Sequence, residues 1–176
     1  MEIDKGMAHQ IQVFIGQHSY LHTSLPRFPF AHLIALPQGF ALLPLSGTFV
    51  GNVGAQLGGE LHATYPELRM LTAPLAKLGT ELSLRGPIAY VETEYFGGYG
   101  SQGSVVWDAG SIVFGPLRTG EPDEWEFSPI ASTALEEGAI NQALRYLGVA
   151  RGTSGDEFAA LQLSKCRSND EWLSEA

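Results

Sequence analysis

The sequence predicts an α+β fold in which an antiparallel sheet packs against several amphipathic helices. Strand-like segments occupy much of the first half and the region 87–115, where they predict a three-stranded meander. Amphipathic helices with capping residues follow, and strands and helices do not alternate as they do in parallel α/β proteins. A length of 176 residues is typical of one domain, so we expect residues 1–176 to form a single α+β domain.

In the first half, polar and apolar residues alternate over 9–15, which predicts a strand. Two apolar runs, 31–36 and 39–45, are separated by Pro-Gln-Gly and predict a hairpin. Apolar residues four apart over 48–61 indicate a helix, although the several glycines in this segment disfavour helical structure. From Pro66 to residue 82, leucines three and four apart predict an amphipathic helix that Pro74 kinks or divides.

The clearest predicted helix runs from Thr133 to Leu147. Thr133 and Glu136 have capping-box spacing, an apolar stripe follows, and Gly148 is placed to cap the end. A short helix is expected over 156–163. Ser168 and Glu171 repeat the capping-box spacing before a last helical turn.

The net charge of −9 is unevenly distributed. Residues 1–87 carry five acids and five bases, whereas residues 88–176 carry fourteen acids and five bases. An acidic surface repels phosphate backbones, which argues against nucleic-acid binding. It favours solubility and fast encounter with a basic protein partner.

Several observations predict a cytoplasmic protein. The first ten residues lack a signal-peptide pattern, and the most apolar segment, 28–51, is divided by Pro37 and Pro44 into pieces too short to span a membrane. The single Cys166 fits a reducing compartment, and nothing marks a base beside it that would make it a nucleophile.

Gly98, Gly100 and Gly103 form a literal G-x-G-x-x-G after a predicted strand. A phosphate-binding loop needs a helix after its last glycine, but here a strand pattern follows, so we expect no nucleotide or other cofactor. One interpretation is a glycine-rich hairpin whose flanking aromatic residues pack on the core. The other is an adaptable loop that binds a partner through Tyr95 and Tyr99, with Gln102 at its tip.

A second candidate surface is the acidic segment GEPDEWEF. Asp123, Glu124, Trp125 and Glu126 could join Tyr99 in one contact surface for a basic protein, with carboxylates at the rim and aromatic residues supplying affinity. The alternative is a solvated linker whose Trp125 tucks into the core.

The main alternative function is a small enzyme or small-molecule-binding protein. Glu92, Glu94 and Asp108 would then lie in a pocket beneath the glycine loop. His18 and His22 have helical metal-ligand spacing, but the residues around them are turn-like and His32 lies in an apolar run. We therefore expect no metal site. A purely structural subunit is a third possibility.

The stretches AYVETEYFGGYGSQGSVVW, GSIVFGP, AINQALRYLGV and SNDEWL carry a resemblance to a known group. Over residues 88–117, 139–149 and 168–173, the chain resembles small uncharacterised bacterial proteins associated with immunity to polymorphic or contact-delivered toxins. The resemblance implies a cytoplasmic protein that binds and blocks a toxin without catalysis, and it assigns no functional residue. The favoured prediction is therefore a non-enzymatic binding protein.

Overall fold

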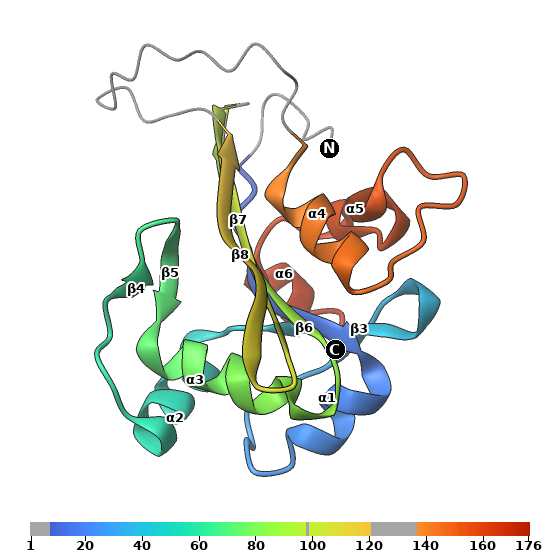
Figure 1. Ribbon diagram of the computed structural model, residues 1–176. Helices are drawn as coiled ribbons and strands as arrows, with labels where there is room; N and C mark the ends of the chain where they lie inside the picture. Colours follow the sequence, from blue (N-terminus) through green and yellow to red (C-terminus); the bar gives the residue numbers. More distant parts are fainter. Residues whose placement is uncertain (1–7, 98, 121–136) are drawn as a thin grey trace.

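The fold is α+β, built around a six-stranded antiparallel sheet (Figure 1). The computed structural model describes residues 8–97, 99–120 and 137–176. The strand order β2-β3-β1-β6-β7-β8 places β1 and β6 in the centre, and a small second sheet pairs β4 with β5. The strands are β1 (Gln12–Gln17), β2 (Ile34–Ala35), β3 (Phe40–Pro44), β4 (Ala63–Tyr65), β5 (Leu68–Thr72), β6 (Ile88–Phe96), β7 (Tyr99–Asp108) and β8 (Ser111–Gly120).

Helices cover both faces of the main sheet, so its central strands are buried on both sides. Along β1, Val13 and Ile15 join one apolar cluster and Phe14 joins the other, as the alternation of a strand requires. One cluster contains residues of α4 (Ala139–Tyr146), α5 (Glu157–Ala160), η3 (Leu163–Lys165) and α6 (Asn169–Leu173). The other contains residues of α1 (His18–Ser24), α2 (Gly47–Leu57) and α3 (Ala73–Leu82).

The first predicted strand and hairpin are confirmed. β1 begins three residues later than the alternation over 9–15 suggests, and β2 and β3 pair in antiparallel register across the turn η1 (Pro37–Gly39). The predicted helix over 48–61 corresponds to α2, which Ser46 caps by accepting a bond from Phe49 N at 3.2 Å. α2 ends at Leu57, and Leu61 lies beyond it with 73% of its surface exposed.

The prediction of one helix from Pro66 to residue 82 is wrong in its first half. Leu68 and Leu71 lie on β5, and only the part from Ala73 onward is helical, as α3. Pro74 occupies the first turn of α3, where its missing N–H is tolerated and its fixed φ favours helix. The proline therefore starts a helix instead of kinking one. A second short turn, η2 (Ser83–Arg85), follows α3.

The expectation that the segment around His18 and His22 is turn-like is also wrong, because these residues form α1. The buried Leu21 anchors the helix on the sheet, and the hydroxyls of Thr23 and Ser24 bond back to carbonyl groups one turn earlier.

The meander over 87–115 is confirmed as β6, β7 and β8, with β8 continuing to Gly120. The helix predicted from Thr133 instead begins at Ala139, because the backbone of Gly138 is extended (φ −57°, ψ 139°). Thr133, Leu135 and Glu136 lie outside the described residues.

The two predicted C-terminal helices form, and the second has the cap that the sequence predicts. The Asp156 carboxylate accepts from Ala159 N at 2.8 Å, although α5 ends at Ala160 and not at residue 163. Ser168 Oγ accepts from Glu171 N at 3.2 Å, and Glu171 accepts in return from Arg167 N at 2.7 Å. None of the helices in the described part of the chain is long and apolar enough to cross a membrane.

Candidate functional site

The glycine-rich stretch is the turn of a β-hairpin. Phe96 of β6 pairs with Tyr99 of β7, which leaves a two-residue connection, and Gly97 there has a φ of +60°. β7 then passes through Gly100 and Gly103 as a strand. The element after the last glycine is therefore a strand, as the sequence predicts, and it cannot present the N-terminal amides of a helix to a phosphate.

Two of the glycines are required by close packing. A Cβ at Gly100 would lie 2.0 Å from the carbonyl oxygen of Glu94, and the residue has a φ of +150°. A Cβ at Gly103 would lie 2.6 Å from a methyl group of Leu68, which packs there from β5. Gly100 allows the two strands of the hairpin to approach each other, and Gly103 allows β5 of the small sheet to pack on β7 of the main sheet.

The aromatic residues of the hairpin have different environments. Phe96 and Tyr99 are 81% and 69% exposed. Tyr95 is partly buried, its hydroxyl accepts a bond from Gln102 Nε2 at 3.1 Å, and burial raises the pKa of its phenol. Phe96 and Tyr99 therefore do not pack on the core, contrary to the first interpretation, whereas Tyr95 is partly covered without belonging to either core cluster.

Gln102 does not lie at the tip, contrary to the prediction. Its side chain is 7% exposed beneath α4, where Oε1 accepts from Ile140 N at 3.0 Å. Gln102 thus connects the start of α4 to Tyr95 and is closed to a partner in this structure. Sequence reasoning could not find this role because Gln102 and Ile140 are far apart in the chain.

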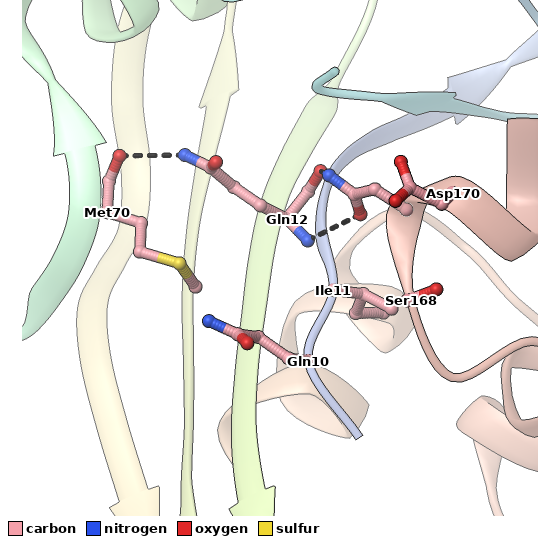
Figure 2. A pocket seen from close by; sticks show the side chains of 7 residues that line it. Gln10, Ile11, Gln12, Met70, Ser168 and Asp170 are labelled. Atoms are coloured by element: carbon pink, nitrogen blue, oxygen red, sulfur yellow. Dashed lines mark hydrogen bonds between the residues drawn. The ribbon is translucent and has the colours of Figure 1, made fainter. Parts of the chain in front are cut away.

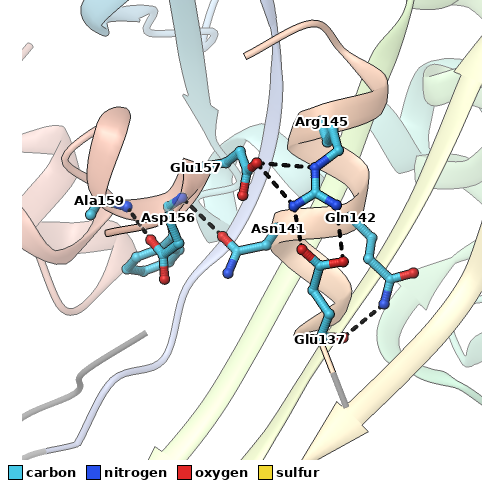
Figure 3. A network of polar contacts seen from close by, with 8 residues as sticks. Glu137, Asn141, Gln142, Arg145, Asp156, Glu157 and Ala159 are labelled. Atoms are coloured by element: carbon cyan, nitrogen blue, oxygen red, sulfur yellow. Dashed lines mark hydrogen bonds and ion pairs between the residues drawn. The ribbon is translucent and has the colours of Figure 1, made fainter. Parts of the chain in front are cut away.

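A polar network fixes α4 against α5 (Figure 3). Arg145 of α4 bonds Glu157 at 3.0 Å, and Glu157 is only 5% exposed. Asn141 Oδ1 accepts from Phe158 N at 2.9 Å. Arg145 also pairs with Glu137 just before the helix. These bonds hold the helix that covers Gln102.

The three candidate carboxylates do not form one pocket. Glu92 is 6% exposed and accepts bonds from Arg69 N (2.7 Å), Met70 N (3.1 Å) and the Tyr90 hydroxyl (2.6 Å). Burial and the neighbouring Glu92 raise the pKa of the Tyr90 phenol well above its usual value. Glu92 therefore attaches β5 to β6.

The other two carboxylates lie on either side of this attachment. Glu94 pairs with the Arg69 guanidinium at 3.3 Å, nearer the tip. Asp108 lies at the far end of β7, where its backbone is opposite Ser111 of β8 in the strand register. In the register of β6 and β7, Glu92 is opposite Gly103. The five residues from Gly103 to Asp108 span about 17 Å of strand, so Glu92 and Asp108 are about that far apart along the sheet.

The histidines do not assemble into a metal site. The rings of His18 and His22 stack with centroids 5.6 Å apart on α1, and His32 is exposed on another segment. Within the described ranges, no group of three or more His, Cys, Asp or Glu residues is placed to hold a metal. Cys166 is buried, and burial raises the pKa of its thiol.

The candidate residues Asp123, Glu124, Trp125 and Glu126 lie outside the described residues, and their role stays a prediction. The described residues on either side of them are held at the same end of β7 and β8. Gly120 pairs with Ser101, and Ala139 N donates to Thr119 Oγ1 at 2.9 Å.

A polar pocket of about 220 Å³ lies between the start of β1, β5 and the start of α6 (Figure 2). Gln12 Nε2 crosses toward β5 and donates to Met70 O at 2.7 Å, and Gln12 N donates to Asn169 Oδ1 at 2.9 Å. These bonds join the surrounding elements. The lining residues are Gln10, Ile11, Gln12, Met70, Ser168, Asn169 and Asp170.

Comparison of the chain with models of known protein families, with characterised proteins and with solved structures found no match. The function is therefore argued from the geometry of the chain itself.

Proposed function

We propose that this protein is a non-catalytic binding protein that docks on another protein through the tip of the β6–β7 hairpin. The observation that carries the proposal is the exposure of Phe96 and Tyr99, at 81% and 69%. The two residues are directly paired, so their side chains lie on the same face of the hairpin. Large aromatic side chains are enriched among the residues that dominate binding energy at protein interfaces.

Hydrogen bonds that fix Tyr95, next to the exposed Phe96, favour binding by the end of the β6–β7 hairpin. The backbone of Tyr95 pairs with His9 through two hydrogen bonds of 3.0 Å, and its hydroxyl is bonded to Gln102. Gln102 is itself a residue of β7 and accepts from Ile140 N of α4 at 3.0 Å, so the β6–β7 hairpin is held by the segment before β1 and by α4 just before its last pair of residues. A partner would meet a preformed aromatic surface, which lowers the entropy lost on binding.

The charge of the chain supports a basic partner. The net charge is −9, and residues 121–136 contain five acids and no base. The described residues that flank this segment are attached to the ends of two strands, Gly120 by pairing with Ser101 of β7 and Ala139 by a hydrogen bond to Thr119 of β8. Acidic groups around an aromatic contact accelerate encounter with a positively charged protein. The sequence resemblance extends this proposal to a toxin that the chain neutralises.

Catalysis is the weaker alternative because of the positions of the carboxylates. Glu92 is occupied by three hydrogen bonds, and Asp108 lies at the other end of its strand. A general acid and a general base must reach the same reacting group of a substrate, at most about 10 Å apart in glycoside hydrolysis, and Glu92 and Asp108 are separated by about 17 Å of strand.

The test begins with a photoreactive amino acid at Phe96, introduced into the full chain in the cells that produce it. A matched probe at Leu84, which is 68% exposed next to the β7–β8 turn, reports contacts made by any exposed apolar position. We expect one protein to cross-link from Phe96 but not from Leu84. Mass spectrometry identifies this partner, which is then purified.

Binding kinetics with the purified partner complete the test. Phe96→Ala and Tyr99→Ala should each accelerate dissociation about tenfold or more, since an interface hot spot contributes more than about 1.4 kcal/mol. Leu84→Ala should dissociate at the rate of the parent chain. High salt should slow association of the parent. Folded tip variants that bind and dissociate like the parent would overturn the proposal.

A further inference from the structure

A short segment before β1 connects the docking hairpin to the C-terminal part of the chain. His9 N donates to Tyr95 O and Tyr95 N donates to His9 O, both at 3.0 Å. The next residue, Gln10, donates its N–H to Arg167 O at 2.8 Å. The segment 8–11 therefore lies between β6, just below the aromatic tip, and the residues that lead into α6.

The side chain of His9 is enclosed at this junction. It is 2% exposed, and its ring packs beside Phe158 with centroids 6.0 Å apart. Nδ1 lies 2.7 Å from Thr93 Oγ1, which also accepts from Ile11 N at 3.1 Å. Nε2 is buried and has no hydrogen-bond partner of ordinary geometry within the described part of the chain.

These surroundings favour the neutral ring. Burial lowers the pKa of His9, because a charged imidazolium would lose its water, and this outweighs the nearby carbonyl of Leu163. Arg167 also disfavours the charge, whereas Glu171 favours it. Three uncharged groups also surround the ring: the Thr93 hydroxyl of β6, the Phe158 ring of α5, and the backbone carbonyl of Cys166 before α6, which favours the charged form.

We propose that His9 is a pH-sensitive latch that holds the segment 8–11 against β6 at neutral pH and releases it in acid. The neutral ring binds one proton from solvent and becomes an imidazolium with two N–H donors. The donor at Nδ1 has the Thr93 hydroxyl as an acceptor, whereas Nε2 has no acceptor of ordinary geometry within the described residues, and the nearby carbonyls of Leu163 and Cys166 offset only part of the cost of burying the charge. Moving the charged ring into water lowers its free energy. The backbone hydrogen bonds of His9 to Tyr95 and of Gln10 to Arg167 open with this movement.

The direction of the pH effect follows from proton binding. The unfolded chain carries a histidine with an ordinary pKa of about 6.5, and the pKa in the folded chain is lower. As pH falls below about 6.5, the unfolded or open form binds more protons than the closed form, so the closed form loses stability. The contribution of His9 is fully present above that pH.

The latch has a consequence for docking. Tyr95 directly precedes Phe96, so release of the segment 8–11 removes one of the two supports of the β6–β7 hairpin. Partner binding should weaken in acid. This consequence rests on the proposed function, whereas the latch itself does not.

The test is amide hydrogen exchange and NMR titration of the full chain without a partner. Protection of the His9, Ile11 and Tyr95 amides, corrected for intrinsic exchange rates, should fall between pH 7.5 and 5.0, by up to about thirtyfold, since pH 5.0 lies about 1.5 units below the ordinary histidine pKa of about 6.5. The amide of Leu42 on β3 should keep its protection. His9→Asn retains a partner for Thr93 but does not titrate, and it should abolish the pH dependence. His32→Asn, at an exposed site, should preserve it.

Two outcomes overturn the latch. One is equal protection of these three amides at both pH values in the parent, and the other is the same acid loss in His9→Asn. If His9→Asn does not fold, the parent ring signals decide, because titration at the ordinary pKa without loss of protection is incompatible with a latch. Partner dissociation at the two pH values, measured separately, tests the docking consequence alone.

Discussion

Leu144 provides the sharpest test of how α4 is attached to the sheet. Its side chain is fully buried in the cluster that includes Ile140 of the same helix and Val106 of β7. Leu144→Ala removes three carbon atoms, worth about 2.4 kcal/mol at about 0.8 kcal/mol each. A residual cavity of roughly 40–80 Å³ adds about 1–2 kcal/mol at about 24 cal/mol per Å³. The free energy of unfolding should therefore fall by about 3–4 kcal/mol.

Urea denaturation followed by tryptophan fluorescence measures this change. Leu84→Ala is the matched control, since the same atoms are removed from a side chain that is 68% exposed. The control should change stability by less than about 0.5 kcal/mol. A loss below about 0.5 kcal/mol for Leu144→Ala, with an unchanged urea slope, would refute the packing of α4 on β7.

Three further predictions concern the hairpin and its attachment. Glu92→Gln should lower the free energy of unfolding by about 1–3 kcal/mol in urea denaturation, because a carboxylate with three donors is replaced. Glu94→Gln, which removes one partner of an exposed ion pair, should change the free energy of unfolding by less than about 1 kcal/mol. Equal losses for the two variants would contradict the conclusion that Glu92 has a structural role that Glu94 lacks. Gly100→Ala should lower the melting temperature and reduce the free energy of unfolding by about 1–3 kcal/mol, because the new Cβ meets the Glu94 carbonyl. An unchanged free energy of unfolding for Gly100→Ala would mean that Gly100 and the Glu94 carbonyl are farther apart than in this structure. Phe96→Ala and Tyr99→Ala should alter unfolding by less than about 0.5 kcal/mol each, since both are mostly exposed, and a larger loss would indicate a role in folding.

Elements specified by neighbouring residues could be predicted from the sequence. The strands of the meander follow β-branched and aromatic runs, and the turn at Ala109 and Gly110 separates the last two of them. The cap of α6 follows from Ser168 and Glu171, three residues apart. In each case the interactions that decide the structure lie within a few residues, where the sequence pattern records them.

Elements that depend on distant contacts were predicted less well. Leu68 and Leu71 fit a helical spacing, yet Leu68 packs on Gly103 and Glu92 accepts the amides of Arg69 and Met70. These contacts hold the segment extended, as β5. The start of α4 at Ala139 is likewise set by Gln102 and Thr119, whose side chains accept the first helical N–H groups. Neither partner is close in sequence.

The exposure of the aromatic tip follows from where the covering elements end. On one face of the sheet, the start of α4 reaches Gln102, which in turn bonds Tyr95. On the other face, β5 reaches Glu94 through the Arg69 guanidinium. Phe96 lies two residues beyond Glu94 on that same face. A sequence pattern identifies aromatic residues beside glycines, but it does not record that Tyr95 is partly covered through contacts from distant parts of the chain while Phe96 and Tyr99 are exposed.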